Sequence, residues 1–223
     1  MRLEETGFVG QSLGMNPKWA EENLQTIRTL MERSAVYRRA LAPIMTFVGA
    51  MGIVGGLTGW FFQIESSRGF LSIWMGVAII SLTGALLLVR RQALKDSEQF
   101  WSPPTRRIAQ ALMPAFFVGL ILAVLALFDS GEGESGGSGV LVVAWTLFYG
   151  CAIHAAGFFM PRGVRWLGWI FIITGLLALI YLAATIDQEK PVSPHLLMAI
   201  IFGGLHLAYG IYLYFTEKRH PVA

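Results

Sequence analysis

Charged residues are scarce in this chain, and long apolar stretches separate them. Only 14% of the 223 residues are Asp, Glu, Lys or Arg, whereas soluble domains carry about a quarter. Stretches of about twenty apolar residues are long enough to cross the hydrocarbon core of a bilayer. We therefore expect an all-α, polytopic integral membrane protein with six transmembrane helices, at residues 41–62, 70–89, 108–128, 140–160, 164–185 and 195–215.

Several motifs that carry chemistry are missing as well. No carboxylate lies within an expected span, so proton or sodium coupling lacks its usual groups. The chain has no glycine-rich phosphate loop, no His-x-x-x-His pair and no Asn-Pro-Ala motif. No connecting loop exceeds about twenty residues, which leaves no soluble domain to house an active site. We expect no enzymatic activity.

Cysteine occurs once, at Cys151 inside the fourth expected span. One cysteine excludes an intramolecular disulfide. A thiolate nucleophile or zinc ligand is disfavoured because apolar surroundings raise the pKa of a thiol, so we expect Cys151 to pack as a small apolar group. The first forty residues are polar and charged and lack the pattern of a cleaved signal peptide. The first span is therefore expected to direct membrane insertion.

Basic residues lie almost entirely on one side of the expected spans. Fourteen of the 17 Lys and Arg residues precede the first span, follow the last, or lie in the second and fourth connections. Arg165 lies at the start of the fifth span on the same side, and the other two are Arg68 and Lys190. Basic residues near span ends stay cytoplasmic, so we expect both termini to be cytoplasmic in a bacterial inner membrane. The basic residues that give the pI near 9.2 are therefore expected to contact anionic lipid of the bilayer rather than nucleic acid.

The cytoplasmic N-terminal segment, residues 1–40, contains an expected amphipathic helix at 16–40. Asn16 and Pro17 suit a helix start, and Leu24, Ile27 and Leu30 follow at helical spacing with arginines between them. This pattern predicts an interfacial helix that enters the first span near Pro43. It also suits docking of a cytoplasmic or membrane protein partner, and the spacing leaves both alternatives open. Residues 41–215 then form the transmembrane domain and 216–223 a cytoplasmic tail.

The two halves of the chain resemble each other. "LMPAFFVGLILA" from Leu112 and "LMAIIFGGLHLA" from Leu197 match in register, and Trp-x-Gly recurs at Trp74 and Trp166. Three spans in each half would be related by an axis in the membrane plane, because three is odd. The sequence therefore suggests an inverted three-plus-three repeat, in which the first and fourth spans also match, with Gly52, Gly59 and Phe61 opposite Gly150, Gly157 and Phe159.

Glycine is frequent in the expected spans, where small residues let helix backbones approach each other. A Gly-x-x-x-Gly pattern on the first span favours packing within the chain, with a homo-oligomer interface as the alternative. We expect helix packing at Gly52, Gly56, Gly59, Gly150, Gly157, Gly203 and Gly210.

Two histidines share helix faces with these glycines. His154 lies with Gly150 and Gly157, and His206 with Gly203 and Gly210. Each imidazole can hydrogen-bond a neighbouring helix. Alternatively, the pair can ligate one b-type haem as a cofactor, or line a path for a small solute or proton. Both histidines belong to the second half only, which fits a symmetric path less well.

We interpret the chain as a non-catalytic multi-pass membrane protein without a bound cofactor, acting as an accessory subunit, a sensor or a regulatory protein. A channel or transporter-like path for a small solute is the second hypothesis, based on the repeat. A haem-bearing electron-transfer subunit that uses His154 and His206 is the third.

Overall fold

The structure is a computed structural model that describes residues 17–95, 97, 100–128, 136–185 and 192–217. None of these residues lies in a strand. The chain divides into two units, Met1–Arg33 and Ser34–Ala223. In the first unit, residues 17–33 are helical. Residues 129–135, between the third and fourth expected spans, and most of the expected tail lie outside the described residues.

Six helical segments account for almost all of the described chain. Their bounds are α1 Pro17–Phe61, α2 Ser67–Lys95, α3 Pro103–Phe128, α4 Gly136–Ala156 and α5 Arg162–Ala184, followed by a sixth segment made of α6 Pro194–Met198, the π-helix η1 Ala199–Gly204 and α7 Leu205–Glu217. We call this last segment the sixth span.

The prediction of six long apolar helices is confirmed. Six segments are long and apolar enough to cross a membrane, namely Ala40–Phe61, Ser67–Lys95, Thr105–Phe128, Gly137–Ala156, Arg162–Ala184 and Pro194–Thr216. The fourth helix ends at Ala156 and not at 160, because Pro161 disfavours a helical conformation in the residue before it. The expected entry into the first span at Pro43 is not a helix boundary, since α1 continues through that proline.

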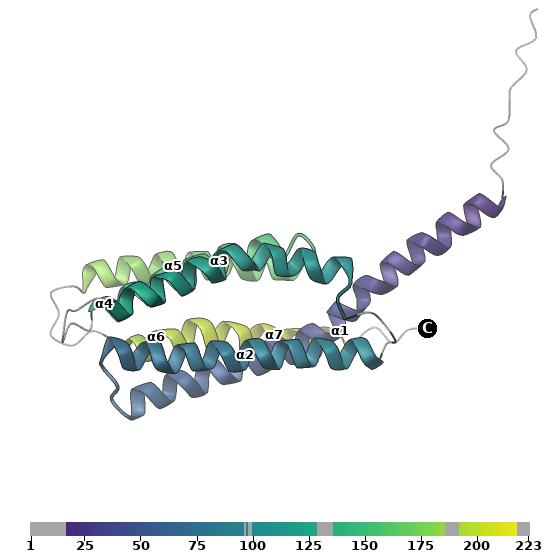
Figure 1. Ribbon diagram of the computed structural model, residues 1–223. Coiled ribbons are helices and arrows are strands. Elements are labelled where there is room, and N and C mark those ends of the chain that lie inside the picture. The colour runs from purple at the N-terminus through teal and green to yellow at the C-terminus, as the bar shows by residue number, and fades with distance from the viewer. Residues whose placement is uncertain (1–16, 96, 98–99, 129–135, 186–191, 218–223) are drawn as a thin grey trace, which may run out of the picture. The chain divides into compact units, whose positions relative to one another are not determined.

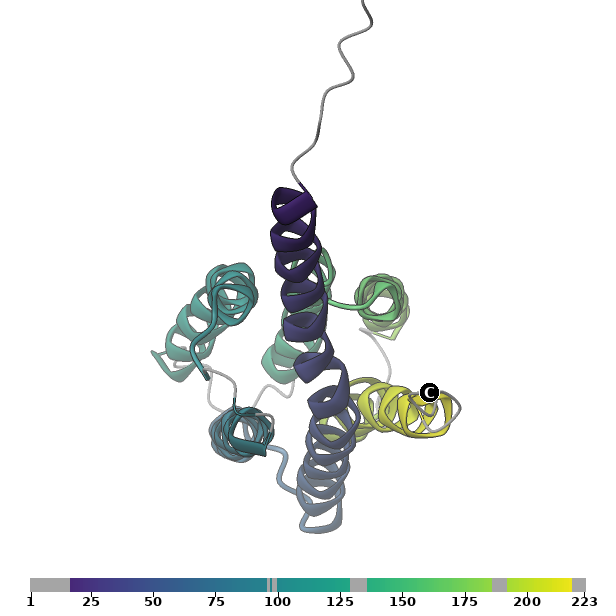
Figure 2. The same cartoon turned by 90° about the vertical axis from the view of Figure 1, so that its right-hand side faces the viewer.

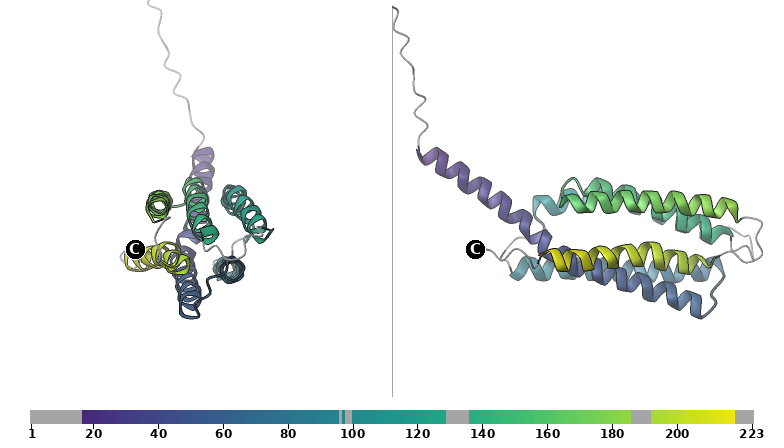
Figure 3. Two further views of the ribbon diagram at one scale, coloured as in Figure 1. Left: turned by 90° about the vertical axis from the view of Figure 1, so that its left-hand side faces the viewer. Right: turned by 180° about the vertical axis from the view of Figure 1, so that it is seen from behind.

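The second unit contains two layers of three helices (Figure 1). One layer holds residues 40–61 of α1, α2 and the sixth span, and the other holds α3, α4 and α5. The view along the helices shows the same division (Figure 2), and so does the view from behind (Figure 3).

In the first layer, α1 lies between α2 and the sixth span. A methyl group added at Gly52 would lie 2.9 Å from Cα of Gly203. Three residues further along α1, the same addition at Gly55 would strike Val77 of α2. Glycines on adjacent parts of the α1 surface therefore allow close contact with two helices.

In the second layer, α4 takes the corresponding middle place. Nε1 of Trp145 donates a hydrogen bond of 3.0 Å to the carbonyl oxygen of Gly119 on α3. On the α5 side, a methyl group at Gly150 would lie 2.9 Å from the backbone nitrogen of Ile172. Both layers are therefore built around a central helix whose glycines permit close packing.

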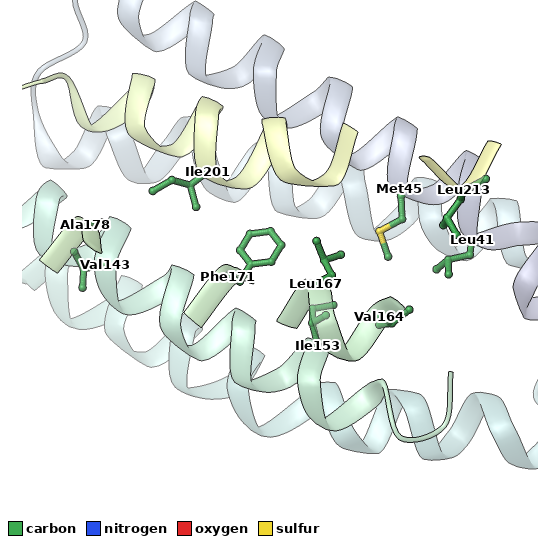
Figure 4. Packing of buried hydrophobic residues seen from close by; sticks show 11 residues of the cluster. Leu41, Met45, Val143, Ile153, Val164, Leu167, Phe171, Ala178, Ile201 and Leu213 are labelled. Carbon is green, nitrogen blue, oxygen red and sulfur yellow. The ribbon is translucent and has the colours of Figure 1, made fainter. Parts of the chain in front are cut away.

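Apolar side chains fill the space between the layers (Figure 4). Phe171 and Val164 of α5 are fully buried there. They belong to a cluster with other residues of α5 and with residues of α1, α4 and the sixth span. These are Leu41, Ala42, Met45, Val143, Ile153, Leu167, Ala178, Ile201 and Leu213. The core of the bundle thus joins the two layers.

Candidate functional site

His206 of the sixth span lies at the centre of a buried polar cluster. Only 1% of its surface is exposed. Its Nδ1 lies 2.7 Å from the carbonyl oxygen of Phe202, and its Nε2 lies 2.7 Å from the hydroxyl of Tyr149 on α4. A carbonyl only accepts, so Nδ1 carries the proton and the tyrosine hydroxyl donates to Nε2. His206 therefore links the two layers through Nε2, while Nδ1 bonds within its own helical segment.

Aromatic rings enclose this cluster. The His206 ring centroid lies 4.5 Å from that of Phe202, 5.2 Å from that of Phe171 and 5.3 Å from that of Tyr149. Phe116 of α3 also packs here. Its ring stacks on that of Tyr149, with the two ring centroids 6.3 Å apart. Four helical segments thus contribute to one polar contact in an apolar setting, where an unpaired polar group is costly.

Phe202 belongs to the π-helix η1, and this explains why its carbonyl accepts from a side chain. A π-turn inserts one residue into an α-helix and disturbs the regular bonding of its carbonyls. The proton on Nδ1 of His206, four residues later, supplies a donor to one of them. His206 therefore stabilises the irregular part of the sixth span.

The π-turn also keeps one face of the sixth span directed toward α1. His195, Ala199, Gly203 and Leu207 face Gly59, Gly56, Gly52 and Gly49 in antiparallel order. Positions four apart drift by about 40° per step in an α-helix, or about 120° over this segment. One inserted residue reduces that drift to about 20°. All four positions can then share the face toward α1.

A second buried histidine, His195, stabilises the other end of the contact between α1 and the sixth span. It is 2% exposed. Its Nε2 donates to the carbonyl oxygen of Ile64 at 3.0 Å, and its Nδ1 accepts from Nε1 of Trp74 at 3.3 Å. The ring also packs at 5.0 Å from that of Phe70. His195 thus joins the start of the sixth span to α2 and to the turn after α1.

That turn has the geometry of a Schellman motif. The amide of Ile64 donates to the carbonyl of Gly59 at 3.0 Å, and that of Gln63 donates to Trp60 at 3.2 Å. Gln63 takes the left-handed conformation with φ of 51°, the position that glycine usually occupies. The motif reverses the chain and holds the carbonyl of Ile64 against His195.

His154 lies in different surroundings from His206. It is partly exposed on α4, and its Nδ1 donates to the carbonyl of Arg165 at 3.3 Å. Its ring meets Phe158 and Trp169 edge-on at 5.5 and 5.3 Å. The described ring partners of His154 and His206 are therefore different residues.

These positions bear on the haem and thiol alternatives. Axial ligation of iron by His206 would require Nε2 to give up the bond from Tyr149, and a visible spectrum of the purified protein would decide that hypothesis. Cys151 is exposed on α4, so our expectation that it packs as a buried apolar group is wrong. We find no group of three His, Cys, Asp or Glu placed to hold a metal ion among the described residues.

The glycines beside the histidines face neighbouring helices. A methyl group at Gly157 would lie 2.8 Å from the backbone nitrogen of Arg165 on α5, and one at Gly210 would lie 2.6 Å from that of Thr46 on α1. At Gly56 and Gly59 the added group would meet Ala199 and His195. These glycines lie where helix backbones come close.

Sequence reasoning singled out His154 and His206 but neither Tyr149 nor His195. The spacing of residues on one helix reveals which of them share a face, whereas Tyr149 and His206 are 57 positions apart. His195 is the first residue of the last expected span, where spacing along one helix indicates no role for it. Its position next to Pro194, where the helix begins, was the available signal.

One end of the second unit carries a cluster of basic side chains. They come from the end of α2 and the beginnings of α3 and α5, which Figure 1 shows on the same side. We call this set the basic end, and it comprises Arg90, Arg91, Lys95, Arg106, Arg107, Arg162 and Arg165. All but Arg165 are exposed. Within the described part of this unit, none of them has an acidic side chain as an ion-pair partner.

Comparisons of the chain with protein-family models, with curated proteins and with solved structures find no match.

Proposed function

We propose that this chain is a non-catalytic, multi-pass protein of the bacterial inner membrane that acts as an accessory subunit, a sensor or a regulatory protein. The observation that supports this most is the bonding of the two buried histidines. Both ring nitrogens of His195 and of His206 make hydrogen bonds to other groups of the bundle. Imidazoles bonded in this way stabilise helix packing. Their ring nitrogens already have partners and are not free to bind a metal or abstract a proton.

The distribution of exposed residues supports insertion in a bilayer. Large apolar side chains are exposed along all six apolar segments, including Val54, Ile80, Leu125 and Ile180. Exposed aromatic side chains lie at both ends, with Trp60, Phe61 and Phe128 at one and Trp101, Phe159 and Trp166 at the other. Such belts are typical of the two membrane interfaces.

The basic end supports the proposed orientation. Seven basic side chains lie at that end, whereas Glu65 and Arg68 are the charged side chains described at the opposite end. Basic residues near span ends remain cytoplasmic. The basic end would then face the cytoplasm, together with both chain termini.

The pairing of helices supports the inverted repeat. If α1, α2 and α3 correspond to α4, α5 and the sixth span, then the contacts of α1 with α2 and the sixth span correspond to those of α4 with α5 and α3. All four contacts occur. The two layers would then be related by a pseudo-twofold axis between them.

Deletion of part of the N-terminal segment tests the accessory role. We expect the full-length, tagged protein to copurify with a membrane or cytoplasmic protein partner in mild detergent, and removal of residues 16–40 to abolish that association. A deletion of residues 1–15 is the matched control and should leave it intact. Both shortened proteins are first checked for their presence in the membrane fraction. If removal of 16–40 left the association unchanged, the docking role of this segment would be refuted.

A further inference from the structure

The turn between α4 and α5 presents basic, aromatic and imidazole groups side by side. Gly157 closes the turn, because its amide donates to the carbonyl of Ile153 at 2.9 Å and its missing side chain admits the backbone of Arg165. The amide of Val164 donates to Pro161 at 2.9 Å. The turn is therefore held on both sides, and it fixes where Arg162 and Arg165 lie.

The two arginines offer a pair of cations that have no acidic partner among the side chains that the structure describes. Arg162 is exposed and Arg165 is partly exposed. The Cζ atom of Arg165 lies 5.2 Å from the ring centroid of Phe158, so the ring contact orients the guanidinium. The N–H groups of a guanidinium lie in its own plane. When the guanidinium is placed on a ring face, they can still donate to a phosphate oxygen.

His154 adds a hydrogen-bonding group beside Arg165. Because Nδ1 donates to the carbonyl of Arg165, the neutral imidazole carries an accepting lone pair on Nε2. That nitrogen makes no hydrogen bond to any residue that the structure describes. A ligand hydroxyl at this site would find an acceptor there.

Exposed apolar surface surrounds these polar groups. Phe158 is 64% exposed, Trp166 70% and Trp169 47%, and Phe158 and Trp169 both contact the His154 ring. A soluble phosphate compound would leave these rings uncovered. A phospholipid would cover them with its glycerol backbone and acyl chains while its phosphate met the arginines.

We propose that the α4–α5 turn is a binding site for an anionic phospholipid with a hydroxyl-bearing headgroup, of the phosphatidylglycerol class. Arg162 and Arg165 bind the phosphate, Nε2 of His154 accepts from a headgroup hydroxyl, and Phe158, Trp166 and Trp169 contact the apolar part of the lipid. The inference rests on the proposed membrane insertion and adds a lipid class and a site to it.

Native mass spectrometry of the full chain in detergent, titrated with lipid, tests the site. We expect phosphatidylglycerol to bind at least about tenfold more tightly than phosphatidylcholine, and the double variant R162Q/R165Q to lose that preference, since a basic group near an anionic lipid contributes about a factor of five. The variant R90Q/R91Q removes the same charge from the same end on α2 and should change the affinity less than about twofold. Thermal unfolding of both variants verifies that they fold.

Three results would overturn the inference. Equal losses in the two double variants would mean diffuse attraction to the basic end and no site. Glycerol 3-phosphate that displaced the lipid at equal concentration would mean a soluble ligand. Equal affinity of the unaltered protein for both lipids would mean no selectivity at all.

The role of His154 has its own readout. His154→Phe keeps a ring in the aromatic cluster but removes the acceptor. It should weaken binding of phosphatidylglycerol by about fivefold and leave phosphatidic acid, which lacks the second glycerol, unaffected; equal weakening of both would refute a headgroup contact by His154. Absence of the chain from carbonate-washed membranes would instead refute membrane insertion, and this inference with it.

Discussion

At the scale of single residues, the hydroxyl of Tyr149 is the donor that connects α4 to the sixth span. Removing it leaves Nε2 of His206 buried without its partner. Hydrogen bonds between membrane helices contribute about 0.6 kcal/mol on average and at most about 1.7 kcal/mol. The contact is therefore of modest energy but fixed in place by the surrounding rings.

We expect Tyr149→Phe to lower the free energy of unfolding by about 0.5–1.5 kcal/mol, measured by denaturant titration in detergent. Tyr212→Phe is the matched control, because Tyr212 is 59% exposed, and it should change the free energy by less than about 0.5 kcal/mol. In a His206→Leu background the effect of Tyr149→Phe should disappear. An unchanged effect there would show that the bond to His206 is not its cause.

Gly52 tests the close approach between α1 and the sixth span. The Cβ of an alanine would lie 2.9 Å from Cα of Gly203, and backbone cannot give way as a flexible side chain can. We expect Gly52→Ala to lower the free energy of unfolding by about 1–3 kcal/mol. The measurement is the thermal unfolding midpoint in detergent.

Gly76→Ala is the control for that substitution. A methyl group at Gly76 meets nothing within 4 Å, and alanine favours a helix over glycine by about 0.5–1 kcal/mol. The midpoint should therefore stay equal or rise. A similar fall for both variants would mean that general loss of glycine, and not contact with Gly203, destabilises the bundle.

The sequence predicted part of this residue-scale organisation. It placed His206 on a glycine-lined face because residues three and four apart share a helix face. It could not identify Tyr149, Trp74 or the carbonyl of Ile64 as histidine partners, since these lie on other helices or on the turn after α1. Which helices meet is decided by packing, and no periodicity on one helix reports it.

At the scale of helices and turns, the π-helix η1 makes a direct prediction. A π-turn contains one residue more than an α-turn, so deletion of one residue there restores an α-helix and keeps both flanks in register. Ile200 is the suitable residue because its side chain is 67% exposed. We expect a chain lacking Ile200 to fold, with an unfolding midpoint that falls only slightly.

A chain lacking Ile173 is the control. Ile173 is 52% exposed in α5, a regular α-helix, so its loss rotates the rest of that helix by about 100° against α4. We expect this deletion to abolish folding, as judged by size-exclusion chromatography in detergent. If the Ile200 deletion were equally damaging, the inserted-residue interpretation of η1 would be wrong.

Most helix bounds were predictable from hydropathy to within a few residues, because apolar length is a property of each segment alone. The exceptions have local causes. The helix α2 continues to Lys95, beyond the expected end at 89, because the arginines and the lysine that extend it add nothing to apolar length. The π-turn was not predictable from its own segment. It brings residues of the sixth span into line with the glycines of α1, and this requirement comes from α1.

At the scale of the whole molecule, the proposed orientation can be measured with reporter fusions. Alkaline phosphatase is active only outside the cytoplasm, whereas green fluorescent protein is fluorescent only inside it. We expect fusions after residue 217 and in the connection between α2 and α3 to be fluorescent. A fusion in the connection between α3 and α4 should have phosphatase activity, and the reverse pattern would contradict the assignment of the basic end to the cytoplasm.

The two-layer arrangement could not be predicted from the sequence, although the similarity of the two halves of the chain was visible there. A repeat indicates which spans correspond, but not which become neighbours. The structure places the first and last spans side by side, at glycines whose value depends on that contact. Local patterns carry no information about such distant pairs.

The contact between the first and last spans has a consequence for how the protein is made. The bond from His195 to Ile64 joins groups 131 positions apart in sequence, and synthesis proceeds from the N-terminus. The glycine-rich face of α1 therefore leaves the ribosome early and stays uncovered until the final span emerges. A chain truncated before Pro194 lacks the helix that covers this face, so we expect it to resist proteolysis in the membrane less well than the full-length chain.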